Sequence, residues 1–240
     1  MLDYRWGVEN RMNDELFIDK RDLTEQAYEL LKTYILTRKF HPNEKLSIDR
    51  LAKLLGVSRT PAKDAVNRLA ADGLITVEPR VGSFVTPITA KDIQEIFDLR
   101  LLYELYAAEK GFENVTQTEI SEMEQIVAQM ASCIEGNRYR REEHARFIEL
   151  DHRLHRFIID SPQNSRLTRT YDGLGIHLNI ARVYYVKELQ NAAQGQEEHE
   201  AIVQAYRQHD LEALKTVLKQ HITGVRDLVL QCVESAGGVL

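Results

Sequence analysis

The chain comprises 240 residues, of which 43% are hydrophobic and 28% are charged, a composition typical of a folded globular protein. It opens without the apolar core of a secretory leader and holds no run of about 18 apolar residues, so we expect a cytoplasmic protein that does not enter the membrane. Its two cysteines lack CxxC spacing, which argues against a disulfide framework and a thiolate zinc site. Taken alone, the net charge of −6 argues against a nucleic-acid partner.

The charge is distributed unevenly, and this distribution divides the chain into parts. Residues 21–87 hold eleven Lys and Arg against eight Asp and Glu, whereas residues 1–20 and 88–240 are both acidic. Residues 1–20 show no sustained periodicity, so we interpret them as a tail without an assigned function. The sequence therefore predicts a small basic domain at 21–87, where a nucleic acid would bind, and a second domain at 88–240.

Two helices are expected at the start of the basic segment. Asp22 and Glu25 form a capping pair, and the apolar residues that follow with helical spacing predict a first helix that ends at the turn of residues 41–43. Ser47 predicts the N-cap of a short second helix. We expect this helix to end at Gly56, because glycine tolerates the left-handed conformation of a tight turn.

A third helix and a hairpin complete the expected domain. Ser58 predicts the N-cap of the third helix, Pro61 falls in its first turn, where a missing N–H costs nothing, and residues 72–73 end it. Two β-like runs follow, at residues 74–77 and 83–86. Two short helices joined by about three residues that include a glycine, followed by a hairpin, predict a winged helix-turn-helix.

The expected third helix leaves one polar face free for DNA. Its inward stripe consists of Ala62, Ala65, Val66 and Leu69. Its opposite face carries Arg59, Thr60, Lys63 and Asn67. Arg and Lys can donate to guanine O6 and N7, Asn can pair with adenine, and Thr can contact a phosphate or the thymine methyl group. Arg80 at the hairpin tip can reach the adjacent minor groove or the backbone; the alternative is a solvated helix face and an ordinary hairpin.

Three stretches of this segment closely resemble the GntR family of bacterial transcription regulators. They are LLGVSRTPAKDAV at 54–66, GLI at 73–75 and RVGSFV at 80–85. The resemblance implies that Arg59 contacts bases, that Lys63 contacts the DNA, and that Gly82 lets the backbone approach the duplex. The sequence departs from the family at Lys63, where Arg is more usual and can form a planar fork that Lys cannot.

A second departure is Asp49, which stands where some members place a DNA-contacting Arg; Arg50 is the neighbouring substitute. The predicted DNA-binding residues are Arg50, Ser58, Arg59, Thr60, Lys63, Asn67, Arg80 and Gly82.

From residue 89 onward strand patterns disappear, and the sequence predicts about six helices. Their breaks are expected near Asn114, Asn137, Pro162, Gly195 and His209–Asp210. The predicted fold class is therefore mainly α, with a winged helix-turn-helix and its small β-hairpin followed by an all-helical bundle.

Four polar residues lie on or beside the apolar stripes of three of these helices: Asp151, His155, His199 and His221. Burying such groups without partners is costly, so they must satisfy one another or a bound group. Two interpretations stand. Spacing alone favours hydrogen-bonded core histidines, but three imidazoles and one carboxylate from three helices are also a plausible ligand set for a divalent metal ion.

Residues 89–233 resemble the all-helical FCD effector domain found in GntR regulators. The resemblance is carried by Arg100 and Glu104, Asp151-x-x-x-His155, NSRL at 164–167, HEAI at 199–202, HDLEA at 209–213 and His221. It implies that Asp151, His155, His199 and His221 hold a divalent ion of the Zn, Ni or Mn type.

Two arginines on apolar stripes, Arg100 and Arg182, are candidate effector-binding residues. A partly buried Arg requires a carboxylate partner. That partner can be an acidic side chain such as Glu104 or a small organic acid, and the sequence does not decide between them.

The combined interpretation is a sequence-specific transcription regulator, a repressor or an activator, that binds operator DNA as a homodimer and responds to a carboxylate effector. One alternative is a metal-stabilised DNA-binding protein without an effector. A metal-dependent hydrolase has little support: His199-Glu200 begins like a zincin motif, but Val203 stands where the second His is needed, so we expect no enzyme activity.

Overall fold

The computed structural model describes residues 20–36, 39–134, 141–174 and 189–239. The chain divides into two compact units at the junction of Thr86 and Pro87, and each unit is described by itself. No helix in the described ranges has the length and apolar character needed to cross a membrane.

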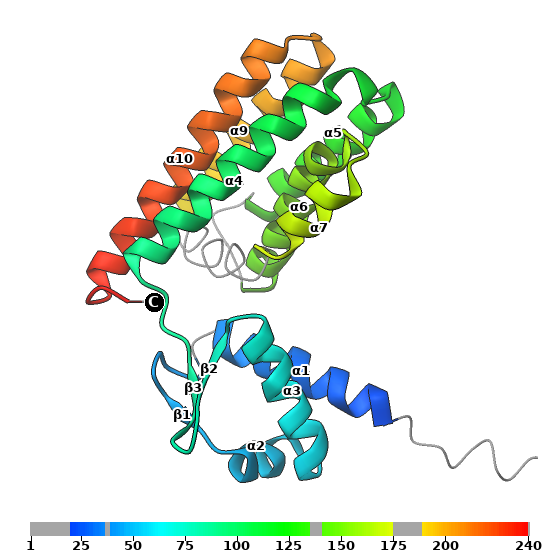
Figure 1. Ribbon diagram of the computed structural model, residues 1–240. Helices are drawn as coiled ribbons and strands as arrows, with labels where there is room; N and C mark the ends of the chain where they lie inside the picture. Colours follow the sequence, from blue (N-terminus) through cyan, green and yellow to red (C-terminus); the bar gives the residue numbers. More distant parts are fainter. Residues whose placement is uncertain (1–19, 37–38, 135–140, 175–188, 240) are drawn as a thin grey trace, which may run out of the picture. The chain divides into compact units, whose positions relative to one another are not determined.

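In the first unit, the described ranges form three helices and a small antiparallel sheet (Figure 1). The elements are α1 (Lys20–Leu36), β1 (Lys45–Leu46), α2 (Ile48–Leu55), α3 (Arg59–Ala71), β2 (Ile75–Glu78) and β3 (Gly82–Val85). The strand order is β1-β3-β2, with Ile75 opposite Val85 and Lys45 opposite Phe84. Helices α1 and α3 pack against each other through buried side chains that include Leu31 and Leu69. This arrangement is the predicted winged helix-turn-helix.

Local sequence signals predicted most of these elements correctly, and the structure differs from the prediction in three places. Helix α1 is already formed at Lys20, so the expectation that Asp22 caps it was wrong; an acid in the first turn still suits the helix dipole. Ser47 and Ser58 occupy the predicted N-cap positions, but neither side chain makes a capping hydrogen bond. Strand β1 was not predicted, because two residues are too few to show a period. Gly56 has the expected left-handed backbone, with φ of 68°.

In the described residues of the second unit, five long helices pack in a ring. Its elements are α4 (Ala90–Gly111), η1 (Phe112–Asn114), α5 (Gln117–Ile134), α6 (Arg141–Asp160), α7 (Ser165–Asp172), α9 (Leu189–Arg207) and α10 (Leu211–Ser235). Helix α4 lies beside α10 (Figure 1), and the packing continues from α10 to α9, α5, α6 and back to α4. The apolar stripes of all five helices therefore face one interior. The mainly α fold class is confirmed.

One predicted break in this unit was wrong. Helix α9 continues through Gly195, although glycine costs about 1 kcal/mol in a helix interior. The reason is tertiary packing, because Ala192, Gln196 and His199 on the same helix are all buried and hold it in place. The breaks near Asn114, Pro162 and His209–Asp210 were placed correctly, and the one near Asn137 lies outside the described residues.

Candidate metal centre and DNA-binding surface

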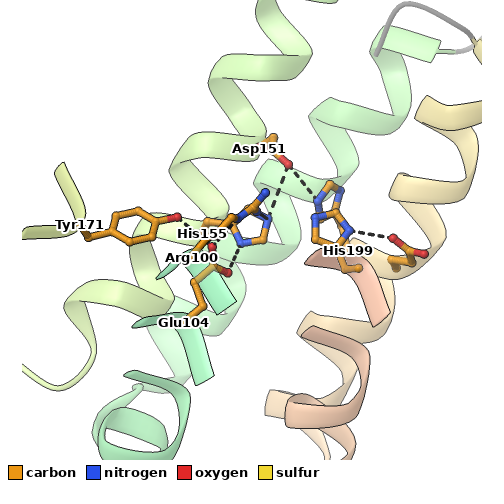
Figure 2. Close-up of polar contacts among 8 residues, drawn as sticks. Arg100, Glu104, Asp151, His155, Tyr171 and His199 are labelled. Carbon is orange, nitrogen blue, oxygen red and sulfur yellow. Dashed lines mark hydrogen bonds and ion pairs between the residues drawn. The ribbon is translucent and has the colours of Figure 1, made fainter. Parts of the chain in front are cut away.

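The four candidate metal ligands meet inside the helical ring. Asp151 and His155 come from α6, His199 from α9 and His221 from α10, and each offers one ligand atom that lies within 4.8 Å of the others. All four side chains are buried. Figure 2 shows Asp151, His155 and His199 directed toward one another. The structure thus brings together residues that are separated by as many as 70 positions in the sequence.

Helical spacing explains why these side chains point inward. Asp151 and His155 are one turn apart on α6, so they share a face, and the neighbouring Leu150 and Leu154 are buried beside them. His221 belongs to the α10 stripe, between Leu218 and Val225 in sequence, both of them buried. Apolar burial therefore fixes the rotation of each helix and, with it, the direction of the polar ligands.

Two of the imidazoles are oriented by carboxylates behind them. His155 Nδ1 lies 2.6 Å from Glu104 Oε2, and His221 Nδ1 lies 2.7 Å from Glu198 Oε2. Because an ionised carboxylate can only accept, Nδ1 of each ring is the donor in these contacts, and Nε2 is the nitrogen left to face the cluster. A carboxylate behind a histidine is the usual outer support of a metal-bound imidazole.

Two ring nitrogens of His199 and His221 distinguish this cluster from an ordinary hydrogen-bonded core. His199 Nε2 lies 3.1 Å from Asp151 Oδ1. His199 Nδ1 and His221 Nε2 have no hydrogen-bond partner within the described part of the chain, although buried polar groups are normally paired. Burial lowers the pKa of both histidines, and for His221 the neighbouring His199 and His155 lower it further. Both rings are therefore neutral, the form that binds a metal ion.

Arg100 and Glu104 form a buried ion pair next to this cluster. Arg100 Nε donates to Glu104 Oε1 at 2.7 Å, and the Tyr171 hydroxyl donates to the same oxygen at 2.8 Å (Figure 2). A second guanidinium nitrogen of Arg100 lies 2.9 Å from His155 Nε2. Burial alone would raise the pKa of Glu104, but the adjacent His155 and Arg100 lower it well below its ordinary range, so it is ionised.

This network contains one of the two partners that the sequence left open for Arg100. Arg100 already has an acidic side-chain partner, Glu104, in the structure. The contacts of Glu104 to His155 and Tyr171, and of Glu198 to His221, were not predicted. The sequence carried only a weak signal for them, namely acidic residues adjacent to apolar stripes. Arg182 lies outside the described residues.

The predicted recognition helix has the expected two faces. Its four inward residues are buried, whereas Arg59, Thr60, Lys63 and Asn67 are exposed. Ser58 is exposed directly before them.

The hairpin and the second helix carry the other candidates. Arg80 stands at the hairpin tip with a left-handed φ of 65°, and Gly82 has φ of 149°. A Cβ atom at Gly82 would lie 2.8 Å from Cε of Lys45, a contact that the flexible lysine side chain can relieve, so the backbone conformation is the reason that favours glycine there. Arg50 lies 3.1 Å from Glu44.

Comparison with known proteins supplies the family. Residues 23–85 match the family described as bacterial regulatory proteins, gntR family, and residues 95–224 match the FCD domain. The chain belongs to the GntR family. The HTH-type transcriptional regulator YdhC of Bacillus subtilis is 27% identical over 196 residues, which cover 82% of this chain and 86% of YdhC.

Solved structures agree with this GntR fold. Escherichia coli McbR/YncC is 20% identical, with a TM-score of 0.70, and the match covers 87% of this chain and 97% of that one. The FCD domain of TM0439, described as metal-free, is 18% identical with a TM-score of 0.53, covering 62% of this chain and 98% of that domain. The protein is therefore a DNA-binding transcription regulator of the GntR/FCD type rather than an enzyme.

Proposed function

We propose that the FCD unit of this GntR regulator binds one divalent metal ion through Asp151, His155, His199 and His221. The observation that carries the proposal is the convergence of four buried ligand atoms within 4.8 Å, from three helices. Three imidazoles and one carboxylate suit a Zn, Ni or Mn type of ion. When bound, the ion supplies a Lewis-acidic centre that can accept a further ligand.

We further propose that a small carboxylic acid is that ligand and that it acts as the effector. Four protein ligands leave coordination positions open for an ion that prefers five or six. Arg100 lies 2.9 Å from His155 Nε2, so its guanidinium borders the cluster and can attract an anion. Arg182 remains a second candidate for pairing with the acid. The alternative is a metal-stabilised regulator without an effector.

The exposed face of α3 supports a DNA-reading role for the first unit. We propose that Arg59, Lys63 and Asn67 contact base edges in the major groove, with Thr60 and Ser58 contacting the backbone. We propose that Arg50, Arg80 and Gly82 add contacts at the edges of this surface. Because helix-turn-helix proteins read two half-sites about one helical turn apart, we propose that the regulator binds as a homodimer, as a repressor or an activator.

Calorimetric titration tests the effector proposal. Candidate mono- and dicarboxylic acids are titrated into metal-loaded, chelator-treated and Arg100→Ala protein, alone and with a duplex selected from a random pool by the wild-type chain. We expect binding only to the metal-loaded protein, and an affinity that changes about 5- to 150-fold when the duplex is present. Binding that persists after metal removal would contradict ligation, and equal affinity with and without duplex would contradict effector control.

A further inference from the structure

An ion pair spans the helix-turn-helix, between the second helix and the start of the recognition helix. Asp49 lies in the first turn of α2, and Arg59 is the first residue of α3. Asp49 Oδ1 lies 2.8 Å from a terminal guanidinium nitrogen of Arg59. The side chains are 59% and 74% exposed, and an ion pair at this exposure adds little to fold stability. Stability is therefore a weak explanation for the contact.

The carboxylate is also unfavourable for DNA affinity by itself. Arg59 lies on the exposed face that is expected to enter the groove, and a negative charge beside it opposes the phosphates of the duplex. Pairing with Arg59 offsets this repulsion. An acid at position 49 therefore weakens the general attraction to DNA. Its effect on the Arg59 side chain is what can account for its presence.

The geometry of guanidinium explains what Asp49 can contribute. Arg has five N–H donors in a rigid fork, and guanine O6 and N7 require only two of them. Asp49 can hold another donor and so restrict the long Arg59 side chain before DNA arrives, which reduces the entropy lost on binding. A carboxylate oxygen can also accept from the amino group of cytosine or adenine at the neighbouring base pair.

We propose that Asp49 is a specificity-determining residue that positions Arg59 for one guanine and lowers affinity for other sequences. The inference rests on the proposed entry of Arg59 into the major groove. It predicts that removing the Asp49 carboxylate lowers the preference for guanine over other bases and does not lower the affinity for random duplex. The loss of a simple DNA contact does not produce this combination.

The test uses the full-length protein and a random duplex pool. The wild-type chain selects its preferred sequence, and binding is then measured to that duplex, to each single base-pair variant and to random duplex. The same measurements are made with Asp49→Ala, Asp49→Asn, Arg59→Ala and the double variant Asp49→Ala/Arg59→Ala. Asp64→Ala is the matched control, because Asp64 is an exposed acid on α3 whose removal changes the net charge equally.

We expect the wild-type chain to prefer guanine at one position roughly 5- to 150-fold, and Arg59→Ala to abolish that preference. Asp49→Ala and Asp49→Asn should reduce it several-fold while binding random duplex at least as tightly as the wild type. When Arg59 is already replaced by Ala, Asp49→Ala should have no further effect on the guanine preference. The control variant Asp64→Ala should keep the guanine preference of the wild type.

Three results would overturn the inference, and they differ in what else they affect. If Arg59→Ala abolishes the guanine preference and Asp49→Ala leaves it intact, only the role of Asp49 is wrong. If Arg59→Ala itself retains the preference, the proposed base contact of Arg59 is wrong as well. Equal losses in Asp49→Ala and Asp64→Ala would also overturn it, since net charge would then be the cause.

Discussion

The carboxylate of Glu198 on α9 accepts a hydrogen bond of 2.7 Å from Nδ1 of His221 on α10. The bond leaves Nε2 of His221 directed to the cluster that contains His199. Neither family resemblance nor helical spacing predicted this contact. Glu198 would therefore orient the proposed metal ligand His221 without ligating the ion itself, and its substitution tests metal binding outside the four proposed ligands.

Glu198→Gln should weaken metal affinity about 10- to 100-fold, because the amide no longer fixes the ring with a charged acceptor. Competition with a chromophoric chelator measures the affinity. Glu197→Gln is the control, since Glu197 is the exposed neighbour and contributes no contact to His221. Equal affinities in the two variants would show that Glu198 does not support the site.

Purified protein should contain about one divalent ion per chain, and His199→Ala or His221→Ala should remove it, because each loses one of four ligands. Elemental analysis measures occupancy. Chelation should also lower the melting temperature of the wild type, while both variants should be insensitive to chelator. Full occupancy in both variants would refute the proposed ligand set.

Arg59→Ala should weaken binding to the selected duplex by about 1–3 kcal/mol, the range for losing a good base contact. Thermal unfolding should be nearly unchanged, because the side chain is largely exposed. Fluorescence anisotropy with selected and random duplexes separates the two kinds of contact. An equal loss on both duplexes would mean that Arg59 contacts only phosphate.

Gly111→Ala should destabilise the FCD unit by about 1–3 kcal/mol or more, because α4 ends against the turn after α6. A Cβ at Gly111 would lie 1.9 Å from Ser161 Oγ and 2.6 Å from the backbone nitrogen of Pro162. Gly224 on α10 has open space, so Gly224→Ala should stabilise by about 0.5–1 kcal/mol. Denaturant unfolding measures both changes; similar effects of the two substitutions would contradict the packing argument.

Much of the fold follows from local sequence signals. Gly56, with its left-handed backbone, and the stripe of Ala62, Ala65, Val66 and Leu69 place the turn and the recognition helix. These signals are readable because turn chemistry and a helical period act over a few residues. The same period showed that Asp151, His155, His199 and His221 face inward, and the family resemblance, rather than spacing, named them as ligands.

Tertiary structure decided which partners these residues have. Helical periodicity gives the face of a side chain but not the helix that packs against that face, so the contacts of Glu104 with His155 and of Glu198 with His221 could not be predicted. The same limit applies to Gly195, where packing outweighs a local helix-breaking preference. It applies to Asp49 and Arg59, which are brought together by the angle of the turn between two helices.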